Sequence, residues 1–222
     1  MKLVAVIQTV IPLEGRKRRL NDKEKQLLER VFHHSLYLPN IRIDEGFAGM
    51  YSLNNLPFTV GNVIYLKNRA EPELLLHECI HVWQYQHKGS RYITDALYAQ
   101  WRNEDNTEYK WEQQISPTCD KQWVGFNVEA QGRFFEDIYT HGELLTGQTP
   151  TPRGNGVFFE ANGHKGRFLF HGKDHTLRAN AAVSAVRGEV NLAQSIFSLF
   201  SRSHTNHLRE ESITENNTLI LH

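Results

Sequence analysis

The sequence predicts an α+β protein, in which short strands and longer helices both occur along one chain. Two segments have the composition of strands: KLVAVIQTVIPL at 2–13 and PFTVGNVIYLKN at 57–68. Two others have the spacing of helices: one begins at Pro72, and one with recurring apolar residues covers 121–142. The strand at 2–13 is expected to be buried, because valine and isoleucine are frequent in it.

Composition excludes several classes of protein. The 222 residues carry 25 basic and 25 acidic side chains, and this neutral balance argues against a nucleic-acid-binding protein and a polybasic membrane-surface protein. No apolar run reaches the roughly 18–20 residues of a membrane span. Cys79 and Cys119 are too few for a disulfide framework. The count of 12 histidines is high and prompts a search for metal ligands.

The first apolar run does not read as a signal peptide. Its basic cluster, Arg16 to Arg19, follows the run instead of preceding it, and no small-residue cleavage site is present. We therefore expect a cytoplasmic protein, with export by a signal-independent secretion system left open. The basic cluster itself is interpreted as a solvated loop before a helix.

Caps and punctuating residues predict the remaining elements of the first half. Asn21 or Asp22 can cap a helix that runs to about His34. A turn and a short strand are expected at 36–46, and Gly61-Asn62 marks a turn or bulge inside the strand segment at 57–68. The helix from Pro72 should continue to about His87, and 91–101 is a further helical stretch.

The chain is expected to divide near residue 142. Residues 1–142 would form the main domain, and 143–222 would pack on it or hang loosely from it. Within the second part, 143–156 looks like a linker, 157–172 like a β-hairpin and 175–199 like a helix that Gly188 weakens. The polar last twenty residues are expected to be loose.

The most informative segment, LLLHECIHVWQ at 74–84, contains the motif H-E-x-x-H on an apolar helix. Residues four apart lie on one helix face, so His77 and His81 can direct their imidazoles at one metal ion. Zn²⁺ prefers such ligands, and a catalytic zinc site keeps one position open. Glu78 would then act as the general base that takes a proton from the attacking water. Two alternatives remain: a pair of core histidines with Glu78 exposed, or a metal site without chemistry.

A third ligand is needed to complete a metal site. Glu129 is the preferred candidate, because a carboxylate among the apolar residues of helix 121–142 is costly unless it is paired or coordinated. An ion pair of Glu129 with Arg133 is the alternative. His87 is interpreted as an exposed residue at the end of its helix, because the glycine of the extended metzincin motif is absent. The other downstream candidates are Asp95, Glu104, Glu108 and Glu112.

Residues 55–86, from NLPFTVGNVIYL to the H-E-x-x-H helix, resemble the core of bacterial zincin-like proteins with the DUF4157 (extracellular contractile injection system core) domain. They also resemble related proteins encoded near Rhs and type VI secretion genes. Thr59, Gly61, Ile64 and Tyr65 match the strand of that pattern, and His77, Glu78, His81, Val82 and Gln84 match its helix. The downstream segment Asn127 to Gln131 is similar to the one that supplies a glutamate ligand in gluzincins. The similarity spans about 25–140 and fades after Gly142.

This resemblance implies a zincin-like fold, with a mixed sheet over the H-E-x-x-H helix and a second helix that completes the site. It further implies that the strand VIYL at 63–66 lies at the sheet edge above the zinc, where an extended peptide could pair with it. Asn127 could orient a ligand. The candidate donors for the transition-state charge are Tyr92, Arg133, Tyr139 and His141.

Three functions follow from these observations. The preferred one is a zinc metallopeptidase that acts on a peptide or protein. The second is a catalytically inactive scaffold that docks in a secretion-related assembly, and the third is an exported toxin or effector protease. Among other histidines, His164, His171 and His175 are interpreted as exposed loop residues, because Gly172 breaks the helix that would align them. The four tryptophans are assigned to the core, and Gln84 to helix surface and packing.

Overall fold

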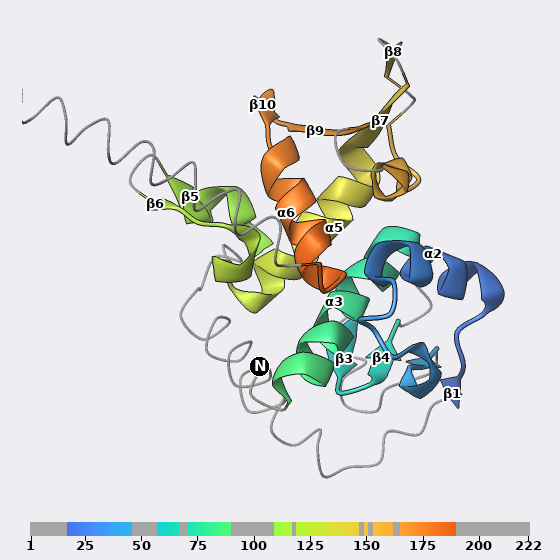
Figure 1. The fold of residues 1–222 in the computed structure, drawn as a ribbon. Helices are drawn as coiled ribbons and strands as arrows, with labels where there is room; N and C mark the ends of the chain where they lie inside the picture. The colour runs from blue at the N-terminus through green and yellow to red at the C-terminus, as the bar shows by residue number, and fades with distance from the viewer. Residues whose placement is uncertain are drawn as a thin grey trace, which may run out of the picture.

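The computed structural model describes residues 17–45, 57–66, 71–89, 109–116, 119–146, 149–150, 153–161 and 165–189. The predicted strand at 2–13, the helix at 91–101 and the C-terminal tail lie outside these residues. Within them, the α+β prediction is confirmed: four α-helices pack with a mixed four-stranded sheet, an antiparallel four-stranded sheet and a two-stranded sheet (Figure 1).

The mixed sheet has the strand order β1-β2-β4-β3. Its strands are β1 (Lys17–Arg18), β2 (Arg42–Asp44), β3 (Phe58–Val60) and β4 (Val63–Tyr65). β2 and β4 run parallel, while β1 and β3 are antiparallel to their neighbours. β3 and β4 form a hairpin whose turn is Gly61-Asn62, as predicted, and Gly61 has the positive φ of 62° that such a turn requires.

The order of these strands corrects one expectation. β4 pairs with β2 on one side and β3 on the other, so it is a central strand. Among the described residues, β3 forms one edge of the sheet and β1 the other. The reason lies in the turn at Gly61-Asn62, which splits the predicted strand in two and places its first half on the outside.

Helix α2 (Asp22–Phe32) begins as predicted. Asn21 and Glu24 form a reciprocal capping box, and the helix buries Leu27, Leu28, Val31 and Phe32. Helix α3 (Pro72–Lys88) also matches its prediction, with proline in its first turn and Gly89 after its last residue. Residues 75–82 of α3 are all buried, because the helix is covered on opposite sides by the mixed sheet and by α5.

The helix predicted over 121–142 is shorter. A 3₁₀ turn, η5 (Trp123–Gly125), comes first, and α5 spans Val128–His141. The boundary falls at Asn127, whose side-chain oxygen accepts a hydrogen bond from the backbone N–H of Ala130 at 2.8 Å. Asparagine is strongly preferred at the N-cap position, because its side chain satisfies a free backbone N–H of the first turn. The helix therefore starts after Asn127 and does not extend to residue 121.

A second sheet follows α5 without a linker. It consists of β7 (Gly142–Thr146), β8 (Thr149–Pro150), β9 (Gly166–Phe170) and β10 (Lys173–Asp174) in the order β10-β9-β7-β8. The expected linker at 143–156 therefore contains a strand. The predicted hairpin at 157–172 is also wrong, because residues Val157–Glu160 form the 3₁₀ helix η6 and β9 pairs with β7.

The packing of Phe158 and Phe159 explains this difference. Both side chains are buried, whereas neighbours on a strand point to opposite faces. Phe158 packs so closely on Gly142 and Gly166 that a β-carbon on either residue would lie within 2.8 Å of its side chain. The glycines that begin β7 and β9 thus make room for the 3₁₀ helix.

The remaining elements are short, apart from one helix. They are the 3₁₀ helices η1 (Leu38–Asn40) and η4 (Trp111–Gln114), the strand pair β5 (Ile115–Ser116) and β6 (Cys119–Asp120), and helix α6 (Thr176–Val186). α6 ends at Val186, and Gly188 just after it takes a φ of 74°. Residues 190–199 of the predicted helix lie outside the described residues.

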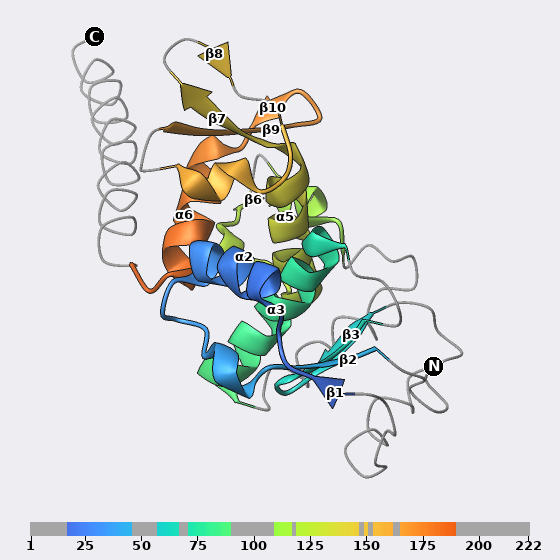
Figure 2. The same ribbon diagram turned by 90° about the vertical axis from the view of Figure 1, so that its right-hand side faces the viewer.

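The elements stack in layers, with the mixed sheet at one end, α2 and α3 above it, then α5 and α6, and the second sheet at the other end (Figure 2). One hydrophobic core runs through these layers. It joins Leu28 and Ile64 of the first half to Phe168 and Ala182 of the second. The division of the chain at residue 142 stays a prediction.

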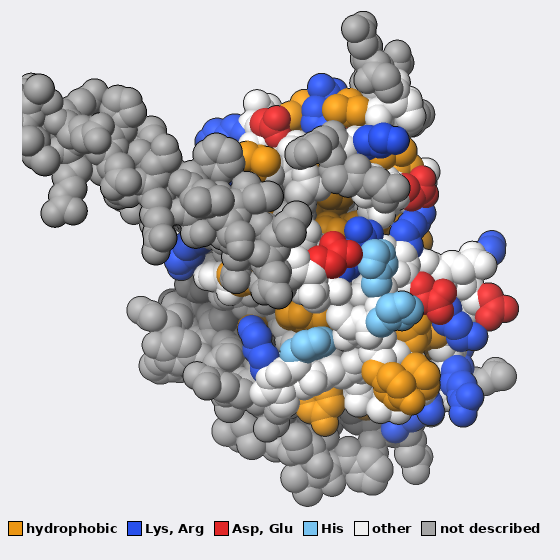
Figure 3. All heavy atoms as spheres, in the orientation of Figure 1, with side chains coloured by type: hydrophobic (Ala, Val, Ile, Leu, Met, Phe, Trp, Pro, Cys, Tyr) orange, Lys and Arg blue, Asp and Glu red, His pale blue; other side chains and the backbone are white. Residues whose placement is uncertain are grey.

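The face seen in Figure 3 intersperses Lys and Arg with Asp and Glu side chains, in keeping with the zero formal net charge. Among the described residues, no helix is both long and apolar enough to cross a membrane.

Candidate metal centre

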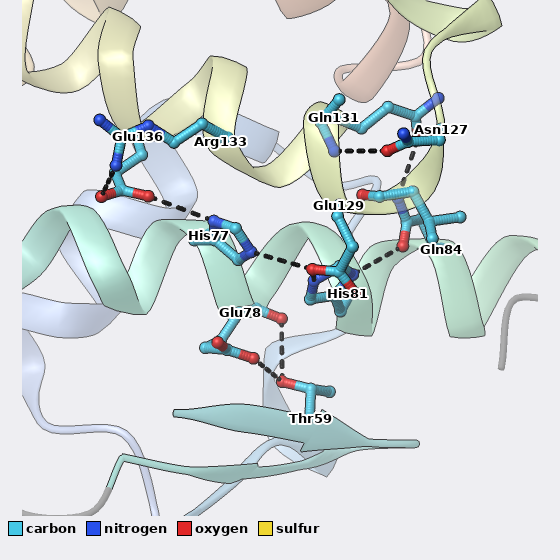
Figure 4. Close-up of polar contacts among 12 residues, drawn as sticks. Thr59, His77, Glu78, His81, Gln84, Asn127, Glu129, Gln131, Arg133 and Glu136 are labelled. Carbon is cyan, nitrogen blue, oxygen red and sulfur yellow. Dashed lines mark hydrogen bonds and ion pairs between the residues drawn. The ribbon is translucent and has the colours of Figure 1, made fainter. Parts of the chain in front are cut away.

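The two histidines of the H-E-x-x-H motif lie together on the face of α3 that packs against α5 (Figure 4). Their ring centroids are 5.1 Å apart. His77 is 7% exposed and His81 is 6% exposed, so both rings are withdrawn from bulk water. The spacing of one helical turn therefore has the consequence expected from the sequence.

Glu129 reaches the same point from the first turn of α5. Its Oε2 lies 3.7 Å from Nε2 of His77 and 3.4 Å from Nε2 of His81. One ligand atom from each of the three residues lies within 4.8 Å of the others, so the group could hold a metal ion. The cap formed by Asn127 fixes where α5 begins and hence where Glu129 stands.

The second nitrogen of each imidazole is held by a hydrogen-bond acceptor. Nδ1 of His77 lies 3.2 Å from Oε2 of Glu136, and Nδ1 of His81 lies 2.9 Å from Oε1 of Gln84. An acceptor at Nδ1 favours the tautomer with its proton there, which leaves the Nε2 lone pair for a metal. Both rings are thereby oriented with Nε2 toward Glu129.

A chain of buried amides extends from His81 into α5. Nε2 of Gln84 donates to Oε1 of Gln131 at 2.8 Å and to the backbone oxygen of Val128 at 3.2 Å. Nε2 of Gln131 in turn donates to backbone oxygens of the turn before α5, including that of Trp123 at 3.1 Å. The expectation that Gln84 serves surface and packing is wrong, because its side chain is fully buried and supports His81.

A second network extends from His77. Glu136 also accepts a hydrogen bond from Arg133 at 2.7 Å, and Arg133 pairs with Asp137 at 2.9 Å. Asp137 accepts a further hydrogen bond from the indole N–H of Trp111 at 2.8 Å. Arg133 is thus engaged by these two carboxylates, and the ion pair with Glu129 considered from sequence does not form.

The buried charges shift the protonation of the site. Burial opposes a charge on His77, but the carboxylates of Glu129 and Glu136 outweigh it and raise the pKa of His77 to about 10. Burial likewise opposes a charge on His81, and Glu129 raises its pKa nevertheless. Burial would raise the pKa of Glu129, but the charges of the two histidines lower it well below the ordinary range. The two imidazoles and the carboxylate of Glu129 thus stabilise one another's charged forms.

Glu78 faces the mixed sheet and is 4% exposed (Figure 4). Thr59 contacts its carboxylate at 2.8 Å. Burial raises the pKa of Glu78, although His77, His81 and Thr59 pull in the opposite direction. A carboxylate with a raised pKa is suited to take up a proton near neutral pH. The alternative of an exposed Glu78 is excluded.

The site suits a divalent cation in the chemistry of its side chains and in the close approach of α5 to α3. The imidazoles of His77 and His81 and the buried carboxylate of Glu129 are nitrogen and oxygen donors of the kind that a divalent ion such as Zn²⁺ accepts. A β-carbon at Gly132 of α5 would lie 2.8 Å from Nε2 of His77. The absence of a side chain there lets α5 approach Nε2 of His77 closely.

Several residues named from sequence do not join this group. Glu112 lies 3.5 Å from His171, and His87 is exposed, with its Nδ1 2.9 Å from the backbone oxygen of Trp83. Asn127 caps α5 and has no described contact with a ligand. Asp95, Glu104, Glu108 and Tyr92 lie outside the described residues.

The remaining proposed donors face other parts of the molecule. Tyr139 packs against the position of Gly156, and the ring of His141 contacts Phe170 at 5.3 Å between centroids. A residue that the sequence did not single out is nearer: the ring of Tyr109 lies 6.3 Å from that of His77. The sequence around Tyr109 does not predict this contact, because it depends on how two segments that are distant in sequence pack together.

The C-terminal histidines behave differently from one another. His171 is exposed as expected, but the side chain of His175 is buried and meets the indole of Trp111 edge-on at 4.9 Å. The interpretation of His175 as an exposed loop residue is therefore wrong. Trp111 and Trp123 lie in the core, as predicted.

Comparisons with protein-family models, curated proteins and solved structures return no significant match for the chain. The resemblance to zincin-like proteins therefore stays a hypothesis based on the motif. The geometry of His77, His81 and Glu129 carries the functional argument.

Proposed function

We propose that this protein is a zinc-dependent metallopeptidase of the H-E-x-x-H type. The observation that carries the proposal is the convergence of His77, His81 and Glu129 on one point, with the buried carboxylate of Glu78 beside them. Two histidines and one glutamate are a ligand set typical of catalytic zinc, because they leave a coordination position open. When bound, zinc would polarise the substrate carbonyl and make an attacking water more acidic.

The protein's own side chains would perform the remaining steps. Glu78 would accept the proton of the attacking water at its carboxylate and pass it to the leaving amine. Glu136 and Gln84 would keep Nε2 of each histidine directed at the ion. Tyr109 is a candidate donor to the oxygen that becomes negatively charged, because its ring lies beside His77.

The substrate would be an extended peptide that adds to the edge of the mixed sheet. β3 replaces β4 as the strand expected to receive it, since β3 has one paired neighbour among the described residues. Backbone hydrogen bonds along β3 would hold the peptide, and its carbonyl would face the metal centre. The contact of Thr59 in this strand with Glu78 supports this assignment, because Glu78 is the residue proposed as general base.

The test combines metal analysis with an unbiased peptide-cleavage assay. The parent should bind one zinc ion per chain and cleave peptides, and His77→Ala and Glu129→Ala should lose the metal. Glu78→Gln should retain zinc while hydrolysis falls by roughly 10³-fold or more. A parent that stays metal-free in excess zinc, or a Glu78→Gln variant that cleaves as well as the parent, would overturn the proposal. Bound zinc without cleavage would favour the inactive docking scaffold.

A further inference from the structure

Thr59 connects the edge strand of the mixed sheet to the motif helix. Its hydroxyl donates a hydrogen bond to Oε2 of Glu78 at 2.8 Å, and the backbone oxygen of Glu78 lies 3.2 Å from the same hydroxyl (Figure 4). The hydroxyl therefore contacts both the side chain and the main chain of the residue that the proposed function uses as general base.

The position of Thr59 on β3 explains why its side chain points toward α3. Phe58 and Val60 belong to a small apolar cluster with Tyr65, separate from the main core. Because side chains alternate along a strand, Thr59 points to the opposite face, toward α3. Thr59 is also β-branched, so its rotation about χ1 is restricted and the sheet holds the hydroxyl in place.

Glu78 needs such a contact because its side chain is flexible and its carboxylate is buried. A buried carboxylate without hydrogen bonds is costly, and an unrestrained one can adopt several orientations. The hydroxyl of Thr59 fixes Oε2, which leaves Oε1 to receive a proton from water. The backbone contact at 3.2 Å also ties this arrangement to the turn of α3 that carries His77.

We propose that Thr59 is a positioning residue that holds the carboxylate of Glu78 in its reactive orientation. This inference rests on the proposed function, and it goes further by assigning a role to the edge strand in organising the base. Loss of the hydroxyl should slow the chemical step without weakening the metal site, because Thr59 contacts none of the three proposed ligands in the described interactions.

The test compares Thr59→Val, which removes the hydroxyl at similar size, with Thr59→Ser, which keeps it. Thr59→Val should lower kcat by about 10–100-fold, with KM and zinc affinity within about twofold of the parent. Thr59→Ser should restore kcat to within about threefold. In the Glu78→Gln background, Thr59→Val should cause no further loss, since the residue it acts through has already been altered.

A readout that does not need activity comes from equilibrium unfolding. A cycle of Thr59→Val and Glu78→Ala, in which alanine removes the acceptor, should show a coupling of about tenfold or more in the unfolding equilibrium constant, as expected for a hydrogen bond to a charged group. If Thr59→Val does not fold, Thr59→Cys offers a similar size with a weaker donor and should give an intermediate kcat.

The outcomes separate this inference from the proposed function. A parent without zinc or hydrolysis refutes the proposed function, and the unfolding cycle then still decides whether Thr59 holds Glu78. An active parent with an equally active Thr59→Val variant overturns the positioning role. The same holds if Thr59→Val loses zinc, if serine does not restore kcat, or if the unfolding cycle shows no coupling.

Discussion

Gly132 of α5 faces Nε2 of His77 so closely that a β-carbon at position 132 would lie 2.8 Å from that nitrogen. Helix α5 therefore approaches α3 at the point where the proposed metal ligands meet. A glycine inside a helix lowers helix stability by about 1 kcal/mol relative to alanine. The glycine is thus unfavourable for the helix and favourable for the site, which makes it a sensitive probe of the metal centre.

We expect Gly132→Ala to weaken zinc binding by roughly 10–100-fold, because the added methyl displaces the ring of His77. Isothermal titration calorimetry with zinc measures this loss. Gly125→Ala is the matched control, since a β-carbon there would meet only the side chain of Lys121 at 4.0 Å. If Gly132→Ala binds zinc as the parent does, zinc binding does not depend on the close approach of α5 to His77 at position 132.

Gly132 also shows where prediction from sequence ends. The motif predicted His77, Glu78 and His81, because one helix fixes the spacing of all three. The cost of burying an unpaired carboxylate predicts Glu129 as the third residue, and the structure places it beside the histidines. Gly132 was not predicted, since its role depends on how closely two helices approach, and no local pattern encodes that distance.

In the fold, too, features set by nearby residues are predictable from the sequence, whereas features set by distant residues are not. α2 and α3 were predicted well, because caps, proline and periodic apolar residues are local signals. The pairing of β7 with β9 was missed, because it depends on Phe158 packing over two glycines that are distant in sequence. The position of β4 inside the sheet was missed for a similar reason, as strand order is a property of the assembled sheet.

The amide of Gln84 is expected to matter as much for the metal as for stability. Gln84→Leu leaves the Nδ1–H of His81 and Oε1 of Gln131 without their partner, and a buried polar group left unpaired costs about 1–3 kcal/mol. The free energy of unfolding should fall by that amount, and zinc affinity by roughly 10–100-fold.

Chemical denaturation in the absence of metal and zinc titration together check this expectation. Gln86→Leu is the control on the same helix, because Gln86 bonds the backbone of Tyr37 and the side chain of Asn62, away from the histidines. Equal zinc affinities of the two variants would show that the orientation of His81 does not depend on Gln84.

Zinc binding should release protons at neutral pH. Glu129 and Glu136 raise the pKa of His77 to about 10 despite its burial, so the metal-free ring is protonated at pH 7. A metal ligand must be neutral at its donor nitrogen, so zinc displaces this proton. Apparent affinity should therefore increase about tenfold per pH unit for each proton released, as pH rises toward 10.

Calorimetry in buffers of different ionisation enthalpy counts the protons directly. Glu136→Gln keeps an acceptor for Nδ1 of His77 but removes one of the charges that raise the pKa. In Glu136→Gln, His77 should therefore lose its proton at a lower pH, so zinc binding should release fewer protons at pH 7 than in the parent. Identical observed enthalpies in all buffers would contradict a protonated His77 in the metal-free protein.

Asp137 predicts a pH dependence of folding that is separate from metal binding. Burial raises the pKa of Asp137 to about 6, although Trp111 and Arg133 act in the opposite direction. In the unfolded chain the carboxyl has its ordinary pKa near 4. Between these values the folded state binds more protons than the unfolded state, so this group's contribution to stability is complete below about pH 4 and is lost as pH rises through 6.

We expect Asp137→Asn to remove this dependence. The side chain is 2% exposed, so solvent screens the effect little, and a difference of about 2 pKa units corresponds to about 3 kcal/mol. The stability of the parent relative to the variant, measured by urea denaturation with chelator present, should decrease by up to about that amount between pH 4 and pH 7. Other titrating groups contribute equally to both proteins and cancel in this difference. A difference that stays constant or grows with pH would show that burial does not raise the pKa of Asp137.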